Sequence, residues 1–107
     1  TEHEIQSSII EHLKKKGWYT MRLNSGNKKK FHGQAAGTPD LMCFKSFTFR
    51  ASAAHILMVE KIQLLFIEVK IPGKEPTPLQ KAKMKELEEY GARCVVATCI
   101  EDLEGYI

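Results

Sequence analysis

Three charged residues could perform chemistry together in this chain, because all three stand at the ends of predicted strands. Asp40 follows the turn-forming run 37–39, and Glu68 and Lys70 close the apolar run 64–71. A carboxylate and an ammonium on such a strand are costly to remove from water unless they are paired or bind a metal. Two carboxylates suit a hard divalent cation, and a nearby lysine can orient or deprotonate a water molecule. The set therefore predicts metal-assisted hydrolysis of a phosphodiester.

The apolar run 64–71 has the pattern of a strand that is buried on both faces. Because side chains alternate along a strand, Glu68 and Lys70 share one face. The residues expected on the opposite face are Leu65, Ile67 and Val69. The two charged groups are therefore expected to meet each other at one end of the sheet.

The chain has the length of one domain, and its net charge of +3 comes from lysines that are grouped. At 107 residues it can bury a single modest core. The groups are Lys14 to Lys16, Lys28 to Lys30, and the later lysines Lys74, Lys81, Lys83 and Lys85. Grouped positive charge favours a nucleic-acid backbone as partner, while solvated surface lysines are the alternative for each group.

Cysteine usage and hydropathy exclude several other classes. Cys43, Cys94 and Cys99 lack the paired spacing of a zinc site and lie in apolar runs, so we interpret them as reduced core residues of a cytoplasmic protein. No apolar stretch is long enough to cross a bilayer, so no membrane partner is expected. No phosphate-binding loop of the Walker type occurs, so no nucleotide cofactor is expected.

The order of predicted elements indicates the fold class. Helices are expected at 2–16 and 78–90, strands at 18–23, 40–44 or a little further, 64–71 and 93–99, and a short last helix from 101. A long polar loop spans 24–38, and 47–63 could be a hairpin arm, a short helix or a partner-facing flap. The order α β β (insert) β α β α predicts an α/β fold with a central mixed β-sheet flanked by helices.

Helix projection selects the polar residues that face the sheet. In the first helix, Glu2 and Gln6 fall within the apolar stripe and Glu4 falls opposite, although fraying is the alternative for Glu2. In the second helix, which Thr77 is expected to cap, Gln80 falls on the inward face. A glutamine in the centre of an apolar face needs a polar partner. Glu2 and Gln80 are therefore candidates to approach the charged set.

With these motifs in this order, the chain resembles the VRR-NUC family of the PD-(D/E)XK nuclease superfamily, in its small stand-alone viral or bacterial form. The resemblance covers nearly the whole chain except 46–63, which looks like an insertion or arm. Matching residues are Glu2, Glu4 to Gln6, Ile9, Leu13, Gly17, Arg22, Asn24 to Gly26, Gly37 to Leu41, Ile67 to Lys70, Pro72, Gly73 and Thr77 to Gln80. The resemblance implies a restriction-endonuclease-like core in a single domain, 1–107.

The resemblance also implies a role for each candidate residue. Asp40 and Glu68 are expected to bind Mg²⁺ or Mn²⁺ together with the Val69 carbonyl. Glu2, which helix projection favours over Glu4, is expected to contact the metal through a bound water. Whether one metal or two is bound stays open. Lys70 is expected to orient or deprotonate the attacking water or to stabilise developing charge, and Gln80 to reach the site. The expected DNA contacts are Arg22, Lys28, Lys29, Lys30 and Lys74, with a solvated strand residue as the alternative for Arg22.

The implied function is a metal-dependent, structure-selective DNA endonuclease. Its expected substrate is branched DNA such as four-way junctions, its expected assembly a homodimer, and its expected location the cytoplasm of a bacterial or phage-infected cell. The apolar run 56–59 would suit a partner surface if it is exposed. One alternative is a non-catalytic DNA-binding module of the same fold, but such a module would not need three charged residues that are costly to bury. Another is a sequence-specific restriction enzyme, but a chain this short has little surface left for reading bases.

Overall fold

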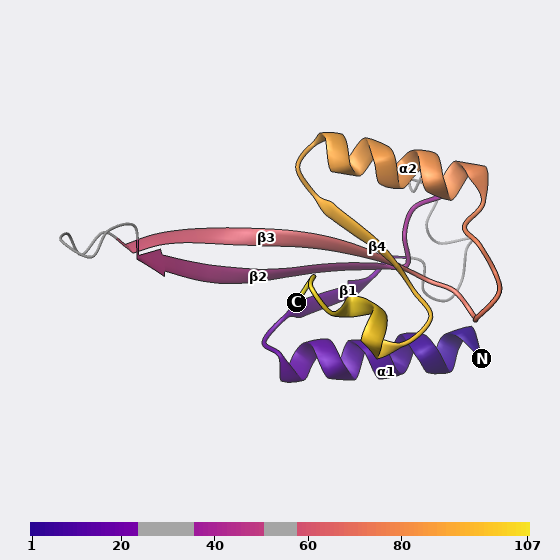
Figure 1. Cartoon of the computed structure of the whole chain (residues 1–107), viewed down its shortest axis with the longest axis horizontal. Helices are drawn as coiled ribbons and strands as arrows, with labels where there is room; N and C mark the ends of the chain where they lie inside the picture. The colour runs from indigo at the N-terminus through magenta and orange to yellow at the C-terminus, as the bar shows by residue number, and fades with distance from the viewer. Residues whose placement is uncertain (24–35, 51–57) are drawn as a thin grey trace.

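The computed structural model describes residues 1–23, 36–50 and 58–107, with backbone alone at 49–50 and 58–59. Two α-helices, four strands and one 3₁₀ helix follow one another in the described ranges (Figure 1). They are α1 (Glu2–Lys15), β1 (Tyr19–Arg22), β2 (Leu41–Arg50), β3 (Met58–Val69), α2 (Pro78–Glu89), β4 (Arg93–Ala97) and η2 (Ile100–Leu103).

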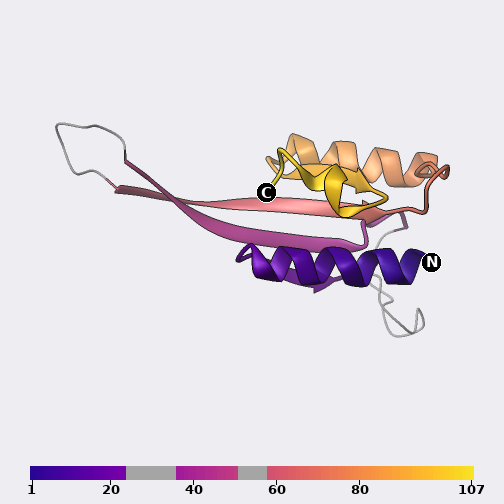
Figure 2. The same cartoon turned by 60° about the horizontal axis from the view of Figure 1, so that its bottom comes forward.

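The strands form one mixed sheet in the order β1-β2-β3-β4. The pairs β1–β2 and β2–β3 are antiparallel, whereas β3 and β4 are parallel. A parallel pair needs a crossover connection, and α2 supplies it. Figure 2 shows α1 and α2 on opposite faces of the sheet. The predicted α/β class and mixed sheet flanked by helices are confirmed.

Helix α1 forms where a capping box precedes an apolar stripe. The Thr1 hydroxyl accepts a hydrogen bond from the Glu4 amide, and the Glu4 side chain reaches back to the cap. The helix buries Ile9 and Leu13 and ends before Gly17, whose positive φ suits a residue without a side chain. These bounds lie within one residue of those predicted.

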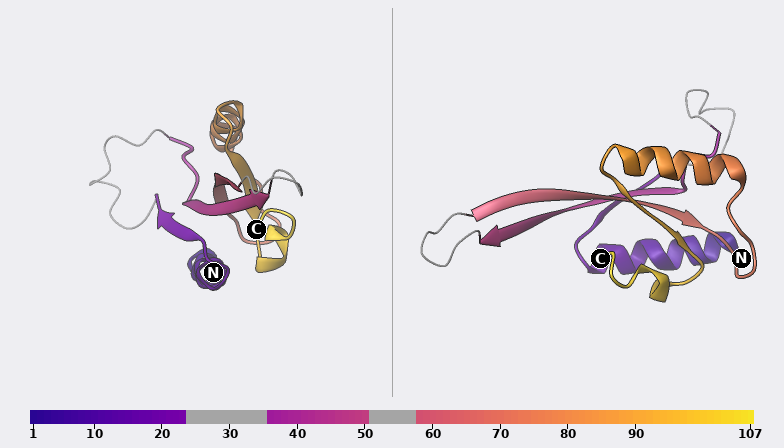
Figure 3. Two further views of the ribbon diagram at one scale, coloured as in Figure 1. Left: turned by 90° about the vertical axis from the view of Figure 1, so that its left-hand side faces the viewer. Right: turned by 45° about the horizontal axis from the view of Figure 1, so that its top comes forward.

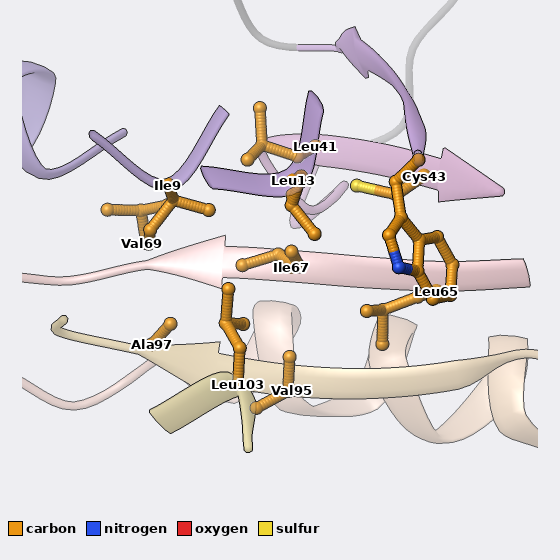
Figure 4. Packing of buried hydrophobic residues seen from close by; sticks show 11 residues of the cluster. Ile9, Leu13, Leu41, Cys43, Leu65, Ile67, Val69, Val95, Ala97 and Leu103 are labelled. Carbon is orange, nitrogen blue, oxygen red and sulfur yellow. The ribbon is translucent and has the colours of Figure 1, made fainter. Parts of the chain in front are cut away.

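Strand β3 is the centre of the core, because both of its faces are covered. All residues from Leu65 to Val69 are buried. In Figure 4, Ile9 and Leu13 of α1 and Leu103 of η2 lie around Ile67 of β3. The expected strand buried on both faces is confirmed, although β3 begins earlier than predicted and ends at Val69.

Strands β2 and β3 extend beyond the helices as a two-stranded arm (Figures 1 and 3). Their antiparallel register runs from Leu41 opposite Ile67 to Arg50 opposite Met58. The hairpin-arm interpretation is therefore confirmed for 47–50 and 58–63, and the short-helix interpretation is wrong for these residues. The expected apolar surface at 56–59 lies outside the residues whose side chains are described.

Two expectations about the last third of the chain are corrected. Strand β4 ends at Ala97, and Cys99 is exposed rather than a core residue, while Cys94 is half-buried and Cys43 buried. The Asp102 carboxylate accepts hydrogen bonds from the Thr98 amide and hydroxyl, and this turns the chain out of the sheet before Cys99. The short last helix is the 3₁₀ helix η2. Within the described ranges no helix has both the length and the apolar character to cross a membrane.

Candidate active site

Asp40 is fixed to the end of strand β3 by a main-chain hydrogen bond. Its Oδ2 atom accepts a hydrogen bond from the Val69 amide at 2.8 Å. Its own carbonyl accepts one from the Leu23 amide at 2.7 Å, which continues the β1–β2 pairing. Asp40 lies just before β2 rather than inside it. The segment that carries it is thus held between β1 and β3, with the carboxylate on β3.

Glu68 is the only buried charged residue among the described side chains, with 2 % of its surface exposed. Its Oε2 atom accepts a hydrogen bond from the Gln80 side-chain amide at 3.2 Å and lies 3.7 Å from the Lys70 ammonium nitrogen. Its Oε1 atom is buried and accepts no hydrogen bond from the described residues. A buried carboxylate oxygen without a donor is costly, and a cation would remove that cost.

The surroundings of Glu68 disfavour its negative charge. Burial is the largest cause, and together with the charge of Asp40 it raises the pKa of Glu68 to about 8. The more distant charge of Glu2 acts in the same direction, whereas the Lys70 ammonium acts against it. A neighbouring carboxylate and burial both disfavour the negative charge of Glu68 unless a positive group compensates for them. The site therefore favours an added cation.

Gln80 joins helix α2 to the buried carboxylate through a capping box. Its Oε1 atom accepts a hydrogen bond from the Thr77 amide at 2.8 Å, and the Thr77 hydroxyl accepts one from the Gln80 amide at 3.2 Å. With Oε1 occupied, the donor end of the side-chain amide is the end that meets Glu68. The sequence predicted the Thr77 cap and the approach of Gln80 to the charged set. It missed the bond from the Thr77 amide to the Gln80 side chain, which the spacing T-x-x-Q could have indicated.

The two glutamates of the first helical turn are in different surroundings. The Glu4 carboxylate accepts a hydrogen bond from the Thr1 hydroxyl at 3.0 Å, so it is engaged in capping. Glu2 is exposed rather than turned toward the core edge, as is usual for the first residue of a helix. Its charge nevertheless contributes to the raised pKa of Glu68, so it faces the same end of the molecule.

The predicted DNA-contact residues are placed only in part. Arg22 is exposed at the end of β1, and its guanidinium donates a hydrogen bond to the Ser7 hydroxyl at 3.2 Å. Lys74 is exposed in the turn that follows β3, where its amide donates to the Ile71 carbonyl. Both therefore lie at the end of the sheet where the carboxylates meet. Lys28, Lys29 and Lys30 lie outside the described residues.

The donor set fits a magnesium-type cation better than a zinc ion. Within the described part of the chain, no three or more histidine, cysteine, aspartate or glutamate side chains are arranged to hold a metal. The pair that does converge, Asp40 and Glu68, presents hard oxygen atoms. Mg²⁺ usually binds through one or two carboxylates with water and substrate oxygens completing the shell, whereas zinc takes three or four protein ligands.

Comparison with known proteins identifies the family to which the chain belongs. The family model for the VRR-NUC domain matches residues 1–100. The chain belongs to the VRR-NUC family. The resemblance that the sequence motifs indicated is thus confirmed, and family membership indicates a nuclease-type function in DNA processing.

Solved structures share the fold of this VRR-NUC chain. One described as a VRR_NUC domain is 20% identical, with a TM-score of 0.66 over 99% of this chain and 97% of that one. Another, described as a VRR_NUC domain protein, is 25% identical, with a TM-score of 0.61 over 96% of this chain and 81% of that one. No curated protein sequence matches the chain.

Proposed function

We propose that this VRR-NUC protein is a Mg²⁺- or Mn²⁺-dependent DNA endonuclease that cuts branched DNA. The observation that carries the proposal is the buried Glu68 carboxylate, which has a second carboxylate beside it and one oxygen that meets no donor among the residues that the structure describes. The Lys70 ammonium nitrogen lies 3.7 Å from the Oε2 atom of Glu68, and among the described residues this ion pair leaves Oε1 without a hydrogen-bond donor. The vacant acceptor supports a cation-binding role.

Asp40 and Glu68 would hold the metal ion, with the Val69 carbonyl as a further oxygen and Glu2 acting through a water. A bound divalent cation supplies Lewis acidity, which lowers the pKa of water and neutralises charge on the phosphate. The Lys70 side chain is 14 % exposed, so its ammonium reaches both Glu68 and the solvent side of the site. There it can orient a water or stabilise negative charge on the phosphate. Gln80 keeps the Glu68 carboxylate in one orientation.

The proposed substrate contacts and assembly follow from the placement of charge and from chain size. Arg22 and Lys74, which are exposed at the site end, and Lys28 to Lys30 would bind phosphates. Resolution of a four-way junction requires a cut in each of two strands. One chain has one carboxylate pair, so a symmetric homodimer would supply the second site. The arm formed by β2 and β3 offers additional surface for such a partner.

A cleavage assay on labelled linear, flapped and four-way-junction DNA tests this proposal. It compares Mg²⁺, Mn²⁺ and chelator, for the native chain, Lys70→Ala and Lys61→Ala. Lys61 is a suitable control because it is an exposed lysine of β3, the strand that directly precedes Lys70, and it lies in the arm, away from Asp40 and Glu68. We expect metal-dependent cutting of the junction by the native chain and Lys61→Ala, and none by Lys70→Ala.

Two outcomes would overturn parts of the proposal. DNA binding that weakens with salt but gives no cutting in any metal would indicate a non-catalytic DNA-binding module. Equal cutting of linear and junction DNA would remove the branched-substrate assignment. Light scattering at micromolar concentration tests the homodimer separately, and a monomer in the presence of junction DNA would contradict it.

A further inference from the structure

Gly37 touches helix α2 with its backbone. A methyl group at its Cα would lie 2.6 Å from the Leu79 carbonyl oxygen, 2.7 Å from the Leu79 carbonyl carbon and 3.0 Å from the Gln80 amide nitrogen. Atoms at the first two of these separations cannot coexist without a shift of the backbone. The segment leading into β2 runs beside the first turn of α2, as Figure 1 shows.

This contact connects the two halves of the carboxylate pair. Three residues after Gly37, Asp40 accepts a hydrogen bond from the Val69 amide. Directly after Leu79, Gln80 donates to Glu68. The carboxylates of Asp40 and Glu68 repel each other when both are charged, so they tend to separate unless their two supports are joined. The contact of Gly37 with Leu79 and Gln80 joins these two supports directly, outside the sheet.

We propose that Gly37 is a positioning residue of the site: its missing side chain allows the Asp40 segment to seat against the first turn of α2 and so sets Asp40 and Gln80 around Glu68. The expected change in kcat rests on the proposed nuclease function, because it presupposes that the chain cuts DNA. The alternative is that a glycine is needed only because its φ is +87°. These two causes can be separated, since other glycines of the chain have the same φ without the contact.

Gly91 provides the matched control. It has a φ of +99° and would place an added methyl group within 4 Å of no other atom. It also flanks the same helix, but at the far end from Gln80. Gly91→Ala therefore carries the backbone strain of a side chain at positive φ, and Gly37→Ala carries this strain together with the collision.

The experiment compares both variants in the full chain by thermal unfolding, by kcat and KM for Mg²⁺-dependent cleavage, and by the NMR signal of the Gln80 side-chain amide. We expect both to lower the unfolding temperature. Gly37→Ala alone should lower kcat by about 10- to 100-fold with KM within about twofold, because small displacements of reacting groups are costly. It alone should also shift the Gln80 amide signal.

A Gly37→Ala variant with the kcat of Gly91→Ala, or with an unmoved Gln80 signal, would overturn the proposal. If Gly37→Ala does not fold, the native chain decides: a nuclear Overhauser contact between the Gly37 Hα protons and the Gln80 amide proton supports the seat, and its absence refutes it. These NMR measurements do not depend on cleavage. If the native chain cuts no DNA, the proposed function is contradicted, but the NMR measurements still test the contact of Gly37 with Leu79 and Gln80.

Discussion

Glu60 and Glu68 are carboxylates of the same strand and the same sheet face, yet they are in opposite surroundings. Eight residues separate them on β3, so both side chains project toward the α2 side. Glu60 is exposed and accepts a hydrogen bond from the Ser46 hydroxyl at 2.6 Å. Glu68 is 2 % exposed, one of its oxygens has no donor in the described part of the chain, and burial raises its pKa to about 8.

The difference between them comes from what covers the sheet. Near Glu60, β3 is paired with β2 in the projecting arm, beyond both helices (Figure 1). Near Glu68, α2 covers the strand, and the segment with Asp40 closes the end. A glutamate on a strand is thus ordinary by itself, and it becomes reactive where a second layer excludes water and adds a second carboxylate.

The largest effect that would sharpen this comparison is loss of cleavage in Glu68→Gln. The substitution keeps the shape and removes the charge that would hold the cation, so kcat should fall by at least about 10²–10³-fold. Glu60→Gln should keep kcat within about twofold, since its carboxylate is exposed and bonded to Ser46. Single-turnover cleavage of junction DNA in Mg²⁺ measures both. Equal losses in the two variants would show that the covering layer does not make the difference.

The next largest effect concerns the amide that α2 places on Glu68. Gln80→Glu keeps the acceptor for the Thr77 amide, so the capping box survives, but it removes the donor to Glu68. The new carboxylate also repels that of Glu68, so we expect kcat to fall by about 10- to 100-fold and the unfolding temperature to fall as well. Thr77→Ala should lower the free energy of unfolding by about 1 kcal/mol, with a smaller loss of kcat. If both variants lose only stability, Gln80 is a helix cap and nothing more.

The main parts of the site region could be predicted from sequence because each has a strong local signal. The run around Glu68 is apolar on both faces and so predicts a buried strand, and Thr77 and Pro78 mark the start of α2. The inward position of Gln80 follows from helix periodicity. These features depend on residues that lie within a few positions of one another.

Contacts between distant segments could not be predicted in the same way. The seat of Gly37 on Leu79 joins residues more than forty positions apart, and nothing in the motif around Asp40 reveals it. Cys99 has an apolar neighbourhood in sequence, but the hydrogen bond that the Thr98 amide donates to the Asp102 carboxylate turns the chain outward there. The sequence pattern of the arm fits both a strand and a helix, and only pairing with β2 decides between them.

A smaller effect should be seen in the stability of the metal-free protein as a function of pH. The pKa of Glu68 is raised to about 8 from an ordinary value of 4.5, so between these values the folded state keeps a proton that the unfolded state has released. The free energy of unfolding should therefore fall as pH rises from about 5 to about 8, by up to about 1.4 kcal/mol per pH unit. Denaturant unfolding in chelator at pH 5, 6, 7 and 8 measures this slope.

The two glutamate variants locate the cause of the slope. Glu68→Gln cannot titrate and should flatten the pH dependence, whereas Glu60→Gln should leave it unchanged. Saturating Mg²⁺ should raise stability most at the alkaline end, where the cation replaces the proton. A slope that persists in Glu68→Gln would assign the titration to a different group and weaken the contrast between the two ends of β3.

The smallest expected effect uses the cysteines as probes of the covering layer. Cys94 lies opposite Phe66 in the β3–β4 register, and its thiol donates a hydrogen bond to the Met84 carbonyl of α2 at 3.5 Å. Burial raises the pKa of the Cys94 thiol to about 11, so its reactive thiolate is scarce. We expect a disulfide reagent to modify exposed Cys99 rapidly and Cys94 slowly. Because Cys43 is also a buried thiol, stopped-flow absorbance of the double variant Cys43→Ala/Cys99→Ser isolates the reaction of Cys94.

Mg²⁺ should slow the reaction of Cys94 further. A cation at Glu68 stabilises the charged carboxylate that Gln80 binds, and α2 then opens over Cys94 less often. The effect should be a few-fold in rate and absent in Glu68→Gln. If Cys94 reacts as fast as Cys99 in the native chain, α2 does not exclude solvent from this face. Glu68 would then owe its burial to the Asp40 segment alone, and the contrast with Glu60 would rest on that segment rather than on the helix.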